Sequence, residues 1–293
     1  MNEPNSKYEA RLKIYKRGTP IYAILALAVT VTAFIIGAKA ENRYLSDNLF
    51  TYLFYVSIAL TVIFAVSALF SFKGHGICRS ERSKLSILSA LTCAGVICID
   101  VTVLPTVASG EAGVLGIPIL ITSLFAILFS LSDIFSLGKG LTILSGYAQI
   151  FFCLFLIAKL YLDHSVEMNA PVKLLSQFSL AAVALGTLSE LRILLNRSVA
   201  GMYVLSAIFS ATLPIAATAA SLIEALTDPV KYTSFYLAAP LFALSFAIPS
   251  LLKLMKARVV KTESNEPNDE SDRISIDEII EEICDPNSTE SDN

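Results

Sequence analysis

The segment from Leu49 to Phe72 constrains the fold of this chain more than any other, because none of its residues carries a charge. As a helix rising about 1.5 Å per residue it would be roughly 36 Å long, enough to cross the ~30 Å hydrocarbon core of a bilayer with some tilt. Asp47 precedes it, and the loop 73–84 that follows holds four basic residues against the single acid Glu81. A flank of this kind determines which side of a membrane the neighbouring segments face.

The rest of the chain contains further long apolar segments, and its composition is that of a protein embedded in a bilayer. Hydrophobic residues make up 55% of the chain and charged residues only 16%, against about 25% in soluble domains. The sequence predicts an all-α polytopic membrane protein, a bundle of about eight transmembrane helices with short loops. The expected spans are approximately 21–38, 49–72, 85–107, 114–136, 141–162, 172–195, 199–223 and 232–254.

The basic residues predict the orientation of these spans. If residues 1–20 form a cytoplasmic basic arm before the membrane domain 21–254, the cytoplasmic segments hold 16 Lys and Arg residues and the outer loops hold 5. Cytoplasmic loops carry such an excess, so we expect a multi-pass protein of the cell membrane with both termini in the cytoplasm. The sequence Ala38-Lys39-Ala40 resembles a signal-peptidase site, but its apolar run is longer than a typical signal peptide, and we expect the first span to be retained.

The last part of the chain, 255–293, begins with basic residues and continues as an acidic tail. From Thr262 onward there are 12 acidic residues and one basic residue, whereas residues 1–261 carry 21 basic and 13 acidic residues. A polar, acidic stretch of this composition is expected to be disordered.

Within the tail, residues 275–284 have the pattern of a short inducible helix. Ser275 and Glu278 form a capping-box pattern, and four isoleucines follow at the spacing of one helical face. An acidic helix with an apolar stripe is typical of a segment that folds in the groove of a protein partner, although a solvated tail or a contact with the chain's own basic loops are open alternatives. The candidate partner-binding residues are Ile276, Ile279, Ile280 and Ile283.

Ionisable residues within membrane spans are costly, and they are therefore candidates for function. Asp100 lies in the third expected span with no basic residue nearby in the sequence, so a hydrogen-bonded structural acid and a proton or cation site are both open. Ala182, Gly186 and Glu190 recur at every fourth residue and so lie on one face of a helix. The small residues Ala182 and Gly186 form a stripe that predicts close approach of another helix. Glu190 is therefore expected to face a helix rather than lipid.

Two further polar residues extend this candidate intramembrane site. Arg192 does not share a helical face with Glu190, and Asp133 near the end of the fourth span is its predicted partner. These residues indicate either a structural polar cluster at the inner interface or part of a ligand or ion path.

Pro214 is a candidate helix hinge, because proline removes a backbone hydrogen bond from the middle of the seventh expected span. That span is uncharged and rich in small residues, which predicts a central place in the bundle. Three expected spans also open with similar Leu-Ser sequences, at Ser89, Ser145 and Ser206, a pattern that a repeated helix hairpin would produce.

No catalytic or cofactor-binding motif is present in the sequence, and we expect no enzymatic activity, no cofactor, no metal site and no nucleic-acid partner. His75 and His164 are the only imidazole ligands available to a metal. The bilayer is the expected environment. The function that the sequence favours is transport of a small solute or ion by a permease-like protein. The alternative is a non-catalytic scaffold or sensor subunit that recruits a cytoplasmic partner through its tail.

Overall fold

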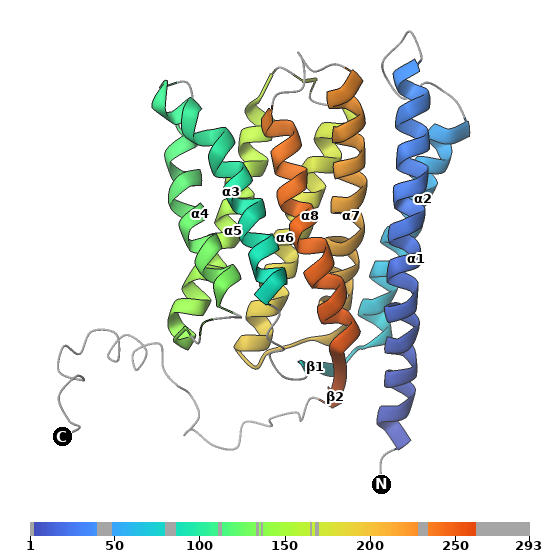
Figure 1. Cartoon of the computed structure of the whole chain (residues 1–293). Coiled ribbons are helices and arrows are strands. Elements are labelled where there is room, and N and C mark those ends of the chain that lie inside the picture. The colour runs from blue at the N-terminus through green and yellow to red at the C-terminus, as the bar shows by residue number, and fades with distance from the viewer. Residues whose placement is uncertain are drawn as a thin grey trace, which may run out of the picture. The chain divides into compact units, whose positions relative to one another are not determined.

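The computed structural model describes residues 3–39, 49–79, 86–110, 113–132, 135, 137–164, 166–167, 170–227 and 234–261 (Figure 1). The candidate residues Asp133, Ile276, Ile279, Ile280 and Ile283, and also Ala40, lie outside these ranges. The elements in chain order are α1 (Glu3–Lys39), α2 (Leu49–Ser71), β1 (His75–Arg79), α3 (Ser86–Ala108), α4 (Gly116–Leu131), α5 (Lys139–Leu162), α6 (Pro171–Leu194), α7 (Ala200–Thr227), α8 (Ser234–Lys256) and β2 (Ala257–Lys261).

The prediction of an all-α polytopic membrane protein is confirmed. Within the described ranges, seven helices are long and apolar enough to cross a membrane, and α4 is a shorter apolar helix. Helices are the expected solution here, because each one satisfies its own backbone hydrogen bonds where no water is available. The span 114–136 was predicted too long, since α4 has 16 residues and ends at Leu131. At 1.5 Å per residue α4 is only about 24 Å long.

The basic arm at the N-terminus is helical and continuous with the first span. Pro20 lies inside the 37-residue α1, so the helix runs on from the arm into the first span. The arm continues the helix because it packs on α2: the Tyr15 hydroxyl is 2.8 Å from Ser67 Oγ, and Arg11 donates a hydrogen bond of 3.1 Å to the carbonyl of Ser71.

Helices α3 to α8 form a closed ring of three consecutive hairpins. Each helix packs against the next along the chain, and α8 returns to pack against α3 (Figure 1). The α1–α2 pair lies outside this ring and packs against α7. Among the described spans α7 is the most buried, which confirms its predicted central place. The repeated hairpin stays a prediction.

A two-stranded antiparallel sheet, which the sequence pattern did not predict, joins the segment after α2 to the segment after α8. His75 in β1 pairs with Lys261 in β2. Glu9 of α1 accepts a 3.0 Å hydrogen bond from the backbone N–H of Val259, and Lys16 donates a 2.7 Å hydrogen bond to the carbonyl of Ala257. The first turns of α1 and the last turn of α8 therefore lie at the same end of the bundle, which we call the basic end; the opposite end is the far end.

Candidate functional site

A polar cavity lies inside the helix ring at the basic end. Its volume is about 230 Å³, and all six helices of the ring contribute to its wall. At ~30 Å³ per water molecule, the cavity holds about seven or eight waters or one small organic solute. Every ring helix places hydroxyl side chains in this wall: Ser89 and Thr92, Ser130 and Ser132, Thr142, Thr187, Ser206 and Ser210, and Ser250.

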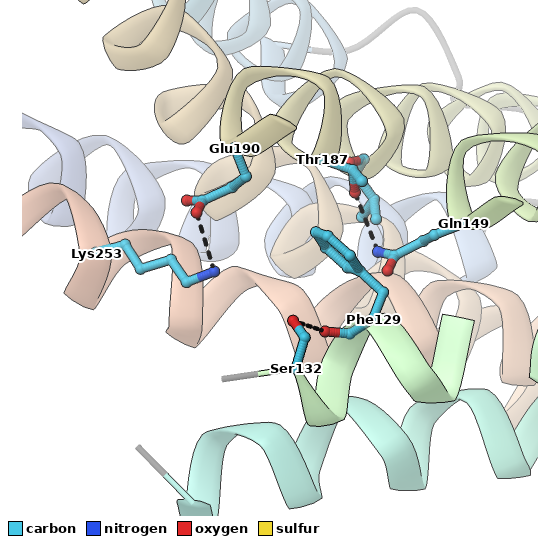
Figure 2. A network of polar contacts seen from close by, with 7 residues as sticks. Phe129, Ser132, Gln149, Thr187, Glu190 and Lys253 are labelled. Carbon is cyan, nitrogen blue, oxygen red and sulfur yellow. Dashed lines mark hydrogen bonds and ion pairs between the residues drawn. The ribbon is translucent and has the colours of Figure 1, made fainter. Parts of the chain in front are cut away.

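One ion pair lies in the wall of this cavity (Figure 2). Lys253 Nζ of α8 is 3.4 Å from Glu190 Oε2 of α6, and the two side chains are 18% and 15% exposed. Both are therefore largely withdrawn from water, and each neutralises the other where an isolated charge would be costly.

The small-residue stripe on α6 explains why Glu190 faces the inside of the ring. Ser210 of α7 donates a 2.7 Å hydrogen bond to the carbonyl of Ala182, and a Cβ atom on Gly186 would lie only 2.7 Å from Ser210 Oγ. Helix α7 thus packs closely on the stripe, as the sequence predicted, and Glu190 one turn further points into the cavity between α6 and α8.

Arg192 does not join this pair. Its Nε donates to the carbonyl of Arg197 at 3.4 Å, beside the connection between α6 and α7. Its predicted partner Asp133 lies outside the described residues. Sequence reasoning missed Lys253 as the partner of Glu190, because a lysine near the end of the last span was interpreted only as a topology signal.

Most hydroxyls in the cavity wall already donate their proton to a backbone carbonyl. The acceptors lie three or four residues back on the same helix, except for Ser210, whose acceptor is on α6. The donors are Thr92, Ser130, Ser132, Thr142, Thr187, Ser206 and Ser210. Because a hydroxyl has one proton and two lone pairs, these side chains offer acceptors to an occupant of the cavity.

Gln149 of α5 lies behind this wall and was not predicted from the sequence. Its side chain is fully buried, and its Nε2 donates a 3.0 Å hydrogen bond to Thr187 Oγ1. Figure 2 shows the Gln149 side chain extending toward Thr187 beside Phe129. Thr187 and Phe129 line the cavity. Within the described part of the chain, Gln149 Oε1 is buried and has no hydrogen-bond partner. Such an acceptor is costly unless something donates to it.

Aromatic side chains close the inner end of the cavity. Phe246 of α8 is part of the wall, and its ring packs against Phe242 one turn nearer the far end. Phe242 meets Phe152 of α5 edge to face, with 5.2 Å between ring centroids, and both side chains are fully buried. Gly95 allows α3 to approach α8 here, because a Cβ on it would collide with Ser245. The ring is therefore hollow at the basic end, and the packed rings of Phe242 and Phe152 lie beyond the cavity.

Asp100 lies apart from the cavity. It is about eight residues beyond Thr92 on α3, roughly 12 Å further toward the far end at helical rise. Its carboxyl group contacts Ser123 of α4, and its Oδ1 atom is buried without a hydrogen-bond partner among the described residues. The structure does not bring Asp100 and Glu190 together.

The proline positions connect α7 and α8. Pro214 is buried inside α7, and the Thr218 hydroxyl lies 2.7 Å from the carbonyl of Pro214 and 3.0 Å from that of Pro240 in α8. One hydroxyl thus links both proline-interrupted helices at the point where each has lost a backbone donor.

Fold and site together define an integral membrane protein of the helical bundle class with a polar cavity inside its ring. Comparison of the chain with protein-family models, with curated protein sequences and with solved structures finds no match in any of the three.

Proposed function

We propose that this protein is a permease-like transporter that binds a small polar solute in the cavity at the basic end. The observation that carries the proposal is an ion pair, Glu190 with Lys253, in a hollow to which all six ring helices contribute. Substrate sites of membrane transporters typically lie inside the bundle between helices, and ionisable side chains at membrane depth are candidates for such sites. We propose that the protein moves this solute unchanged, without enzymatic chemistry.

We propose that the basic end faces the cytoplasm and that the protein resides in the cell membrane. The segments assigned to the cytoplasm hold 16 Lys and Arg residues and the outer loops hold 5, and this excess supports the orientation. In this orientation the cavity belongs to the cytoplasmic half of the membrane, and the Phe152–Phe242 contact closes the route to the outside.

The proline-interrupted helices supply the movement in this proposal. Pro214 and Pro240 lie on the far side of the cavity-lining parts of α7 and α8, and Thr218 joins the two interruptions. Bending at these points would displace the lining segments of both helices together, which would open the aromatic contact and close the basic end. Helices interrupted in this way are a feature of many transporters.

The experiment is uptake into proteoliposomes of radiolabelled small solutes that are neutral, cationic, anionic and zwitterionic. We expect the wild-type protein to accelerate uptake of at least one class over protein-free vesicles. The Glu190→Gln variant should abolish that uptake, whereas Asp100→Asn should retain it, because both changes convert an intramembrane acid to an amide but only Glu190 lines the cavity. Equal uptake by wild type and Glu190→Gln would refute the proposed site.

A further inference from the structure

We infer that the cavity is selective for a small zwitterion that carries an ammonium group and a carboxylate, the chemistry of a free amino acid. This inference rests on the proposed function in that it names the substrate class of the same cavity. The ammonium group would pair with Glu190 and the carboxylate with Lys253.

The balance of charge favours a zwitterion. Among the described residues of the cavity wall, Glu190 is the one acid and Lys253 the one base, so the described wall carries no net charge. An anionic or cationic solute would leave one net charge at membrane depth, which is costly, whereas a zwitterion leaves none. The 3.4 Å separation of Lys253 Nζ and Glu190 Oε2 also exceeds the 2.7–2.9 Å of a strong charge-assisted hydrogen bond. An ammonium has three N–H donors and a carboxylate has two acceptor oxygens, so this one contact does not use the whole capacity of either group.

The hydrogen-bonding capacity of the wall favours an ammonium group next to Glu190. An ammonium has three N–H donors and no acceptor, and Glu190 alone does not satisfy all three. The neighbouring hydroxyls of Thr187, Ser206 and Ser210 have donated their protons to backbone carbonyls and present lone pairs. The wall therefore complements a group that is rich in donors.

Buried Gln149 places a further acceptor directly behind the inner part of the wall, next to Thr187. Its Oε1 atom is fully enclosed and unpartnered among the described residues, although its amide nitrogen is held by Thr187. If the wall beside Thr187 moved so that a solute or a water could donate to this oxygen, the cost of burying it would be removed. The cavity volume of about 230 Å³ limits the solute to a small one.

Binding to the purified full-length protein in lipid nanodiscs tests the inference. The chain has no Trp, but Cys153 is fully buried, so a fluorogenic thiol dye reports thermal unfolding and its shift on ligand addition. The probes are alanine, alaninamide, lactate and lactamide, which share one skeleton and are zwitterionic, cationic, anionic and neutral. A second set of zwitterionic, cationic, anionic and neutral probes has the larger leucine side chain, in case the cavity prefers a larger solute.

We expect the zwitterion to bind most tightly on at least one of the two skeletons. Glu190→Gln should weaken zwitterion and cation binding by about tenfold to a hundredfold, since a hydrogen bond to a charged group is lost. The same variant should strengthen anion binding, because the charge of Lys253 is then uncompensated. Lys253→Met should weaken zwitterion and anion binding by a similar factor and strengthen cation binding, because the charge of Glu190 is then uncompensated. The control Lys256→Met, in the same turn of α8 but outside the cavity wall, should leave all affinities unchanged.

The inference is overturned if the neutral amides bind as tightly as the zwitterions, if neither zwitterion binds, or if Glu190→Gln has no effect on zwitterion affinity. Zwitterion binding without uptake in proteoliposomes would instead contradict the transport proposal and leave the ligand class intact. Uptake of a different solute class without zwitterion preference would contradict only the ligand class.

Discussion

Breaking the Glu190–Lys253 pair should reveal a measurable coupling between α6 and α8. At 3.4 Å and an effective dielectric constant of about 20, the two charges attract each other by about 5 kcal/mol before desolvation is subtracted. Exposed pairs contribute about 0–1 kcal/mol, whereas removing one partner of a fully buried pair costs about 3–5 kcal/mol. With side chains 15% and 18% exposed, we expect an intermediate net coupling of about 1–2 kcal/mol.

The measurement is a double-mutant cycle in the free energy of unfolding, followed by far-ultraviolet circular dichroism in mixed micelles. Glu190→Gln and Lys253→Met should each destabilise the protein, and the double variant should be about 1–2 kcal/mol more stable than the two single effects predict together. The control pairs Glu190→Gln with Lys13→Met, an exposed lysine on α1, and should be additive within ~0.5 kcal/mol. Additive effects for Glu190 and Lys253 would refute the coupling.

Three further predictions concern other parts of the chain. Ser198 both accepts from and donates to the backbone of Ile77, at 3.1 and 2.9 Å, so Ser198→Ala should speed amide exchange in β1 by about fivefold to tenfold; unchanged exchange would contradict this. Lys173 is buried with its amine bonded to two carbonyls, so Lys173→Met should cost about 2 kcal/mol of unfolding free energy; a neutral result would refute that structural role. The proposed tail helix predicts that Ile279→Asp with Ile283→Asp abolishes capture of a cytoplasmic partner from solubilised membranes; identical capture by both proteins would reject it.

The membrane fold was predictable because its signal is local. A segment such as Leu49–Phe72 contains in its own composition the reason for being a membrane helix. The inward direction of Glu190 was also predictable, because the stripe through Ala182 and Gly186 specifies a helix-facing side without reference to the partner.

The features that sequence reasoning missed depend on contacts between distant segments. The pairing of β1 with β2 joins two five-residue strands far apart in the chain, and neither has a strong strand pattern of its own. Choosing Lys253 as the partner of Glu190 requires knowing that α8, which closes the ring against α3, also contacts α6. Gln149 was overlooked because a neutral amide in an apolar helix becomes informative only when one of its atoms is seen to lack a partner.

The most direct test of the account is whether the cavity opens to both sides of the membrane in turn. Ser206→Cys, introduced after replacement of the five native cysteines, places one thiol in the cavity wall, and Ile97→Cys places a control thiol on a surface of α3 outside the cavity. A membrane-impermeant thiol reagent is added to right-side-out and to inside-out vesicles. We predict that Ser206→Cys reacts from the cytoplasmic side and more slowly from the outside, whereas Ile97→Cys reacts from neither. Reaction of Ser206→Cys from one side only, or from neither, would contradict alternating access.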